Sequence, residues 1–101
     1  MLKRLSKDDD FNKVIEKGTW LVDFSATWCG PCRMLEPVLE EFSNNNQVLQ
    51  VDIDSFEELT ARFGIMSVPT LIVFKDGNKV LQDVGYKSLD ELNELIKKDI
   101  S

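Results

Sequence analysis

The chain of 101 residues has the length of one small domain. Its 12 basic and 18 acidic residues give a net charge of −6, which argues against nucleic-acid binding, because phosphate recognition draws mainly on clustered Lys and Arg. No segment is apolar enough for long enough to span a membrane, and the first residues lack the apolar run of a secretory leader, so we expect a cytoplasmic protein with no membrane partner.

The first half of the sequence predicts two strands, each followed or preceded by a helix. Residues 2–5 predict a short strand, and Ser6, followed by three aspartates, predicts the N-cap of an amphipathic helix. Residues 20–26 are almost continuously apolar, which is typical of an interior strand covered on both faces. Pro31 fits the first turn of a second helix. The apolar residues of that helix predict a buried stripe: Met34, Leu35, Val38, Leu39 and Phe42.

The second half of the sequence predicts three strands and two helices. Residues 48–53 predict a strand, and two Ser-x-x-Glu capping boxes, beginning at Ser55 and Ser88, each predict the start of a helix. Residues 69–74 predict another strand. The Asp-Gly turn that follows predicts a hairpin, with the returning strand at residues 79–84.

The order of these elements predicts the fold class. Strands separated by helices favour parallel pairing with right-handed crossovers, whereas the last hairpin adds antiparallel strands. We therefore expect one α/β domain over residues 1–101, in which a mixed central sheet of about five strands is sandwiched between about four helices. Ligands and chemistry in such folds lie beyond the carboxyl ends of the strands, and Cys29 falls at such a position.

The chain has two cysteines and no histidine, which excludes a catalytic Cys–His dyad. Cys29 and Cys32 flank Gly30 and Pro31 at the entry to the second predicted helix. Unpaired backbone N–H groups and the helix dipole favour thiolate over thiol at this position, and the thiolate is the form that attacks a disulfide. Cys29 is therefore the candidate nucleophile, and Cys32, which we expect to be less exposed, is the candidate resolving thiol. Gly30 is expected to let the backbone turn, and Pro31 to fix the helix start.

Half of a metal site is the main alternative for this cysteine pair. Zinc and iron–sulfur centres need about four ligands, whereas one chain supplies two thiolates and no imidazole. A dimer could complete such a site. An adjacent pair in a reducing compartment is more often catalytic or metal-binding than a structural disulfide. Because one chain supplies only two of the ligands that a metal site needs, we expect no bound metal, no other bound cofactor and a monomer.

Several motifs together resemble those of the thioredoxin family. They are "DFSATWCGPC" at 23–32, "SVPT" at 67–70, "FKDG" at 74–77 and Gly85, and the similarity runs over essentially the whole chain. The resemblance implies the thioredoxin fold and reduction of disulfides in other proteins, with the two cysteines alternating between dithiol and disulfide. It also implies recharging by an NADPH-dependent thioredoxin reductase, or by a ferredoxin-dependent one.

The resemblance also implies roles for residues around the cysteines. It implies a cis peptide bond before Pro69, facing the disulfide, where extended backbone at Val68 pairs with a substrate strand. Thr70 and Gly85 are implied to belong to the same substrate-binding surface. Trp28 follows the apolar run and borders the cysteines, so we expect a partly exposed ring packed against the site.

Asp23 interrupts an otherwise apolar strand, although burying an unpaired carboxylate is costly. Burial raises the pKa of a carboxyl group, which makes Asp23 a candidate base for Cys32 near neutral pH. The resemblance supports this role, since Asp23 matches the family's buried acid, which acts through water on the second cysteine. Many relatives carry a lysine near that acid, but the matching positions here are Gln50 and Glu36. We therefore expect Asp23 to titrate at least as high as in relatives with that lysine.

Two other functions remain open from the sequence. One is an oxidant or isomerase of the same fold, against which the Gly30-Pro31 pair and the lack of a leader argue. A measured reduction potential separates it from a reductant. The other is a binding module that holds a partner regardless of redox state, and replacing both cysteines by serine separates it from an enzyme.

Overall fold

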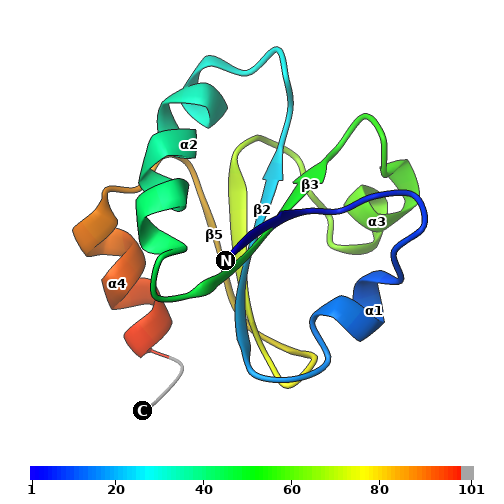
Figure 1. Ribbon diagram of the computed structural model, residues 1–101. Coiled ribbons are helices and arrows are strands. Elements are labelled where there is room, and N and C mark those ends of the chain that lie inside the picture. Colours follow the sequence, from blue (N-terminus) through cyan, green and yellow to red (C-terminus); the bar gives the residue numbers. More distant parts are fainter. Residues whose placement is uncertain (99–101) are drawn as a thin grey trace.

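A five-stranded sheet in the order β1-β3-β2-β4-β5 forms the centre of the molecule (Figure 1). The structure is a computed structural model that describes residues 1–98. The strands are β1 (Leu2–Arg4), β2 (Thr19–Ser25), β3 (Gln47–Asp52), β4 (Thr70–Lys75) and β5 (Asn78–Val84). The helices are α1 (Phe11–Val14), α2 (Gly30–Phe42), α3 (Glu57–Arg62) and α4 (Leu89–Lys97). Strands β1, β3 and β2 pair in parallel, whereas β4 and β5 are antiparallel, which confirms the predicted mixed sheet.

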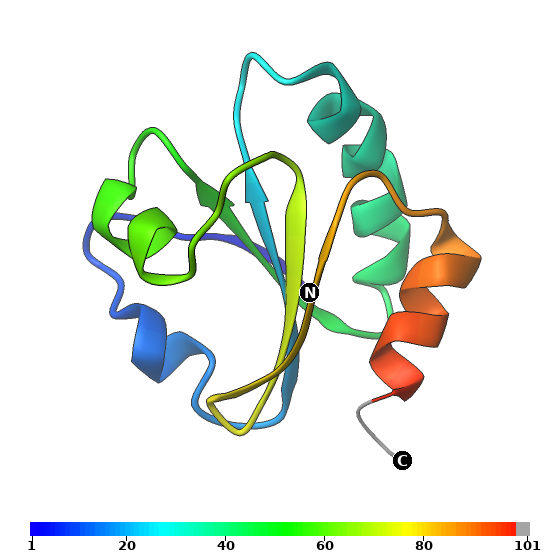
Figure 2. The ribbon, with the colours of Figure 1, turned by 180° about the vertical axis from the view of Figure 1, so that it is seen from behind.

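The helices lie in two layers on either side of the sheet. Helices α1 and α3 cover one face, and α2 and α4 cover the other, as the front and back views show (Figures 1 and 2). No helix within residues 1–98 has the length and apolar character needed to cross a membrane. The layering places the start of α2, the end of β2 and the start of β4 at one end of the sheet.

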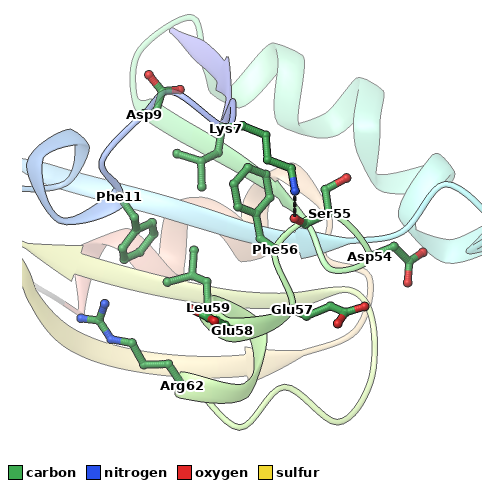
Figure 3. A pocket seen from close by; sticks show the side chains of 11 residues that line it. Lys7, Asp9, Phe11, Asp54, Ser55, Phe56, Glu57, Glu58, Leu59 and Arg62 are labelled. Carbon is green, nitrogen blue, oxygen red and sulfur yellow. Dashed lines mark hydrogen bonds between the residues drawn. The ribbon is translucent and has the colours of Figure 1, made fainter.

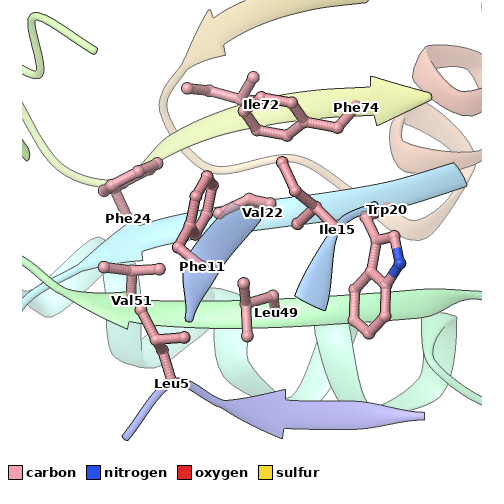
Figure 4. Close-up of a cluster of buried hydrophobic side chains, with 10 residues drawn as sticks. All are labelled: Leu5, Phe11, Ile15, Trp20, Val22, Phe24, Leu49, Val51, Ile72 and Phe74. Carbon is pink, nitrogen blue, oxygen red and sulfur yellow. The ribbon is translucent and has the colours of Figure 1, made fainter. Parts of the chain in front are cut away.

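The face under α1 and α3 is packed with aromatic rings (Figure 4). The ring centroids of Phe11 and Phe74 are 5.7 Å apart, and Phe63 of the α3 region lies 5.5 Å from Phe74 and 5.7 Å from Phe11. Such tilted and edge-on contacts add to the free energy gained by burying the rings. Trp20, at the start of β2, completes this layer and is buried, as expected of a structural residue.

The face under α2 and α4 is mainly aliphatic, with one buried ring, Phe42. Its buried residues include Leu21 of β2, Leu35 and Leu39 of α2, Val73 of β4 and Leu92 of α4. Asp23 also points to this face, because it stands two residues after Leu21 on the same strand. It is the only charged residue among 1–98 that is buried.

Two of the predicted local signals are confirmed. Asp76 and Gly77 both have positive φ, 48° and 84°, as a two-residue hairpin turn of the mirror-image type requires. Ser88 and Glu91 form the predicted capping box at the start of α4, since each side chain accepts a hydrogen bond from the other residue's backbone N–H.

Two predicted helix starts were wrong. Ser6 lies in a turn, where its backbone N–H donates to Asp9 Oδ2 at 2.8 Å, and α1 is instead capped by Asp10, which accepts from Asn12 N. Ser55 does not cap α3, because its hydroxyl donates to Asp52 Oδ2 at 3.3 Å. In both cases a nearby aspartate competes for the serine, and the helix begins later than the serine indicates.

Candidate active site

The two cysteines form a disulfide at the amino end of α2, with Cα atoms 5.2 Å apart. Cys29 is the N-cap of this helix in extended conformation, and its Sγ accepts a hydrogen bond of 3.2 Å from the backbone N–H of Cys32. Pro31 occupies the first turn, as predicted. Gly30 lies outside the left-handed region and a Cβ there would meet nothing within 4 Å, so the turn itself does not require glycine. The space beside it leaves the disulfide approachable.

The two cysteines are almost equally buried in this disulfide form. Cys29 is 5% exposed and Cys32 is 4% exposed, so Cys32 is the less exposed of the two, as expected, but by too little to distinguish them. Both pack with Ala26 and with the partly buried Ile53 and Val68. The access of a substrate therefore depends on the edge of the disulfide that faces the segment before β4.

That segment contains a cis peptide bond between Val68 and Pro69, which confirms the expectation drawn from the resemblance. Cys29 Sγ lies 3.7 Å from Val68 O. Thr70 is buried, and its hydroxyl donates to Ser67 O at 2.6 Å. Because β4 runs antiparallel beside β2, the start of β4 lies next to the end of β2 and thus next to the cysteines.

Gly85 lies beside this loop, at the end of β5. Its backbone N–H donates to Pro69 O at 2.8 Å, and its φ of 99° is a conformation that favours glycine. The structure therefore brings Val68, Pro69, Thr70 and Gly85 to one end of the sheet, although they come from two separate parts of the sequence.

An apolar surface adjoins the disulfide. Trp28 is 65% exposed, and its indole N–H donates to Asp54 Oδ2 at 2.9 Å, which fixes the ring against the loop after β3. A shallow hollow of about 300 Å³ lies between Trp28 and the segment from Ile65 to Val68. Met66 lines it and is 94% exposed, and sequence reasoning missed this residue. The one signal that could have found it is its place directly before "SVPT".

Met34 does not belong to the buried stripe of α2. It is 65% exposed, so the prediction that it faces the core was wrong. The stripe is carried by Leu35, Leu39 and Phe42, which lie four and three residues apart on one face of the helix. Met34 follows Arg33, whose guanidinium donates to Thr27 O at 3.1 Å.

Asp23 is fully buried beneath the amino end of α2. Its Oδ2 accepts a hydrogen bond of 3.2 Å from Gln50 Nε2, and its Oδ1 has no hydrogen-bond partner among the described residues. Burial raises the pKa of Asp23 to about 7; the Gln50 hydrogen bond acts against this rise, and the negative charge of Glu36 adds to it. The expectation of a raised pKa is confirmed, and the carboxyl group changes protonation near neutral pH.

A second hollow lies away from the cysteines. It has a volume of about 700 Å³ and lies between the segment after β1 and helix α3 (Figure 3). Lys7 and Arg62 border it, and both are occupied within the molecule: Lys7 Nζ donates to Ser55 O at 2.8 Å, and Arg62 lies over the ring of Phe11. No group of three or more metal-ligating side chains occurs within residues 1–98.

Comparison with known proteins identifies the family. The thioredoxin family model matches residues 3–98. The chain is 45% identical over 97 residues to a thioredoxin of Staphylococcus epidermidis, a match that covers 92% of this chain and 93% of that protein. The chain belongs to the thioredoxin family.

Solved thioredoxin structures have the same fold. A mutant thioredoxin from Halobacterium salinarum superposes with a TM-score of 0.87 at 34% identity, covering 95% of this chain and 88% of that one. A reduced thioredoxin pre-protein of Schistosoma mansoni gives a TM-score of 0.86 at 35% identity, covering 96% of both chains. Membership of the thioredoxin family, together with the disulfide-bonded Cys-x-x-Cys pair, makes this chain a thiol–disulfide oxidoreductase that reduces disulfides in other proteins.

Proposed function

We propose that Cys29 is the thiol that attacks substrate disulfides and that Cys32 is the thiol that resolves the intermediate. In the reduced protein, the Cys29 thiolate attacks one sulfur of the substrate disulfide. A mixed disulfide forms and the other substrate sulfur leaves as a thiolate. Cys32 then attacks Cys29 Sγ, so that the Cys29–Cys32 disulfide forms and the second substrate thiolate leaves. Two electrons pass from the protein to the substrate.

The observation that carries this assignment is the position of Cys29 as the N-cap of α2. A sulfur at this position receives a backbone N–H and lies at the positive end of the helix dipole, and both stabilise the thiolate. Cys32 lies one turn into the helix, within bonding distance of Cys29, so it is placed to attack the mixed disulfide and not the incoming substrate.

Asp23 is our candidate base for the resolving step. Its unpartnered Oδ1 is the atom available to take the proton of Cys32, directly or through water. A carboxyl group with a pKa of about 7 accepts a proton efficiently near neutral pH and returns it to solvent afterwards.

The substrate-binding role belongs, in our proposal, to the surface around the disulfide. Trp28 supplies an exposed aromatic ring, and the backbone at Val68 offers polar groups to an extended substrate segment, as in strand addition. Gly85 holds this backbone in place by donating its N–H to Pro69 O, and the Thr70 hydroxyl holds it by donating to Ser67 O.

We also propose that a thioredoxin reductase recharges the disulfide, with NADPH or ferredoxin as the electron source. The reversible disulfide would then be the only redox group that this chain needs to carry. We further propose that residues 1–101 act as a single domain, as a monomer and in the cytoplasm. Family membership supports the reductase, since recharging by a reductase is typical of thioredoxins, and the family model that spans residues 3–98 supports a single domain.

A trapping experiment tests the roles of the two cysteines. Cys32→Ser protein should accumulate a covalent complex with a protein disulfide substrate through Cys29, because the mixed disulfide lacks an internal thiol to resolve it. The complex should run as a larger band without reductant and disappear when dithiothreitol is added. The matched control is the Cys29→Ser, Cys32→Ser protein, which should trap nothing. If Cys29→Ser protein trapped the substrate and Cys32→Ser protein did not, the assignment would be reversed.

A further inference from the structure

Three side chains stand in one row across the sheet beneath α2. Gln50 of β3 is in register with Arg4 of β1 on one side and with Asp23 of β2 on the other. Residues in register on neighbouring strands point to the same face of a sheet. All three therefore point toward α2, from which Glu36 approaches the row.

The row contains two separate interactions. Gln50 Nε2 donates to Asp23 Oδ2 at 3.2 Å, and Arg4 Nη2 donates to Glu36 Oε1 at 2.5 Å. The cation of the row is thus bound to Glu36 and not to Asp23. Asp23 has a neutral amide as its hydrogen-bond partner, and the charge that acts on its pKa is the negative charge of Glu36, which raises it.

A polar cavity of about 320 Å³ joins these groups to the resolving cysteine. Arg4, Glu36, Gln50 and Cys32 all line it, whereas Asp23 lies behind Gln50 and is fully buried. A cavity of this size and polarity is large enough for several water molecules with hydrogen-bond partners. The cavity connects Cys32 to solvent, and Gln50, which lines it, is hydrogen-bonded to the buried Asp23.

Other charged groups near Asp23 come from three elements. The charged or titratable neighbours that line the cavity are Arg4 from β1, Cys32, Arg33 and Glu36 from α2, and Asp52 from β3. On the other side β4 presents the apolar Leu71, in register with Asp23. Beyond it, Asp83 of β5 is paired with Lys87 at 3.6 Å. Glu36 is the one carboxylate of this set whose charge raises the pKa of Asp23.

We propose that Arg4 is a positioning residue for the resolving step: by pairing with Glu36 it offsets part of the charge that opposes ionisation of Asp23, and so keeps Asp23 able to take the proton of Cys32 near neutral pH. This inference rests on the proposed role of Asp23 as the base. The ion pair is partly exposed, so it contributes little to stability, and its effect is expected in the pH dependence of catalysis.

Four single variants, the Arg4→Met, Glu36→Gln double variant and Asp23→Asn test the proposal. Arg4→Met removes the cation but keeps most of the aliphatic stem, and Glu36→Gln removes the opposing charge. Lys3→Met is the matched control for the cation, because Lys3 is the neighbour of Arg4 on β1, points to the opposite face and pairs with Asp9 at 3.2 Å. Glu40→Gln is the control for the carboxylate, one turn further along α2 and exposed.

Two measurements on each variant separate the effect of the ion pair on the titration of Asp23 from its effect on the rate of the resolving step. The first is the titration of Asp23 by carboxyl-carbon NMR in the reduced protein. The second is stopped-flow reaction of the reduced protein with dithiobis(nitrobenzoic acid), in which attack by Cys29 releases the first coloured thiolate and resolution by Cys32 releases the second. The second phase is followed as a function of pH.

The proposal predicts opposite shifts for the two charges. Arg4→Met should raise the Asp23 midpoint by about half a pH unit, the size expected for one charge acting across a partly solvated cavity. Below that midpoint the second phase should slow by about threefold and recover at high pH. Glu36→Gln should lower the midpoint of the Asp23 titration and the midpoint of the pH profile of the second phase. The double variant, which removes a neutral pair, should return close to the parent, and both controls should match the parent.

Three results would overturn the proposal. One is an Asp23 midpoint that Arg4→Met leaves unchanged. Another is a slowed second phase that does not recover at high pH, which indicates structural damage. The third is a second phase with the parent pH profile in Asp23→Asn protein, which removes Asp23 as the base and with it the role of Arg4. The NMR titration needs no turnover, so it distinguishes failure of the ion pair from failure of the proposed base.

Discussion

The two faces of the sheet bury different kinds of side chain. Under α1 and α3, the buried layer is built from aromatic and large aliphatic side chains and holds no charged group among the described residues. Under α2 and α4, the layer is mainly aliphatic but contains the buried carboxyl group of Asp23 and, close by, a cavity bordered by charged side chains. One face is packed for stability, whereas the other gives up stability to place a titratable group below the cysteines.

This difference shows where function is concentrated. Cys29, Cys32 and Asp23 all belong to β2, α2 or the junction between them, and so to the α2 face or its end. The aromatic face contributes to the site only through the loops at the same end of the sheet. Substitutions on the two faces should therefore separate activity from stability, and the four predictions below use that separation, from the largest effect to the smallest.

The largest effect is expected from Cys29→Ser. Reduction of insulin disulfides, measured as turbidity with dithiothreitol as the electron source, should fall by at least about a thousandfold relative to the protein-catalysed rate, because a hydroxyl is a poor nucleophile toward sulfur. The aromatic face should be untouched, so the near-ultraviolet circular dichroism should match that of the reduced parent. A variant that retains substantial activity would place the reaction outside the cysteine pair.

The next effect is expected on the opposite face, from Phe74→Ala. Removing this buried ring, which contacts Phe11 and Phe63, should lower the free energy of unfolding by about 3–5 kcal/mol in urea titrations. Activity per folded molecule should remain that of the parent. Val80→Ala, at an exposed position of β5, is the control and should have little effect. A loss of activity in folded Phe74→Ala protein would contradict the separation of the two faces.

Asp23→Asn should stabilise the protein in a pH-dependent way. The carboxyl pKa is about 7 in the folded protein and 3.8 for an ordinary aspartate, so the unfolded chain loses this proton first as the pH rises. The folded state therefore loses stability progressively between these two pH values, by up to about 4 kcal/mol. The variant removes that loss, so its advantage in urea titrations should be large at pH 8 and small near pH 4.

The control for this experiment is Asp8→Asn, which removes an exposed aspartate and should give no such pH dependence. Equal stabilisation by Asp23→Asn at both pH values would mean that the carboxyl group does not titrate differently in the folded and unfolded chains. The α2 face would then not give up stability to hold the acid.

The smallest effect is expected from Ser88→Ala at the start of α4. Loss of the capping box leaves the N–H of Glu91 without its side-chain acceptor and should cost about 1 kcal/mol of unfolding free energy. Ser88→Asp keeps an acceptor at this position and should recover most of the loss. If alanine and aspartate are equally destabilising, the cap does not support the helix that packs on the α2 face.

The sequence predicted the order of elements and the layout of the site, because both depend on local patterns. Apolar runs identified β2 and β4, the Asp76-Gly77 turn identified the hairpin, and the cysteines lie after β2 as the fold class requires. The raised pKa of Asp23 was predictable for the same reason, since an aspartate within an apolar strand is expected to be buried.

The remaining features depend on contacts that local patterns do not encode. The Arg4–Glu36 ion pair joins residues 32 positions apart on β1 and α2, and no periodicity brings them together. Met34 lies four residues before Val38, as the apolar stripe allows, but it is 65% exposed whereas the adjacent Leu35 is fully buried, so Met34 lies at the solvent-facing margin of the stripe. The misplaced caps at Ser6 and Ser55 have the same origin, because each serine has an aspartate partner that the capping motif does not consider.

The contrasting environments of the two tryptophans have an optical consequence. Trp28 is largely exposed and adjoins Cys29, whereas Trp20 is buried at the start of β2 with its indole N–H bonded to Lys17 O. A disulfide beside an indole ring quenches its emission, and a buried indole emits at shorter wavelength than an exposed one. The intrinsic fluorescence of this protein should therefore contain two signals: the intensity from Trp28 follows the redox state, and the emission wavelength of Trp20 follows folding, with no added label.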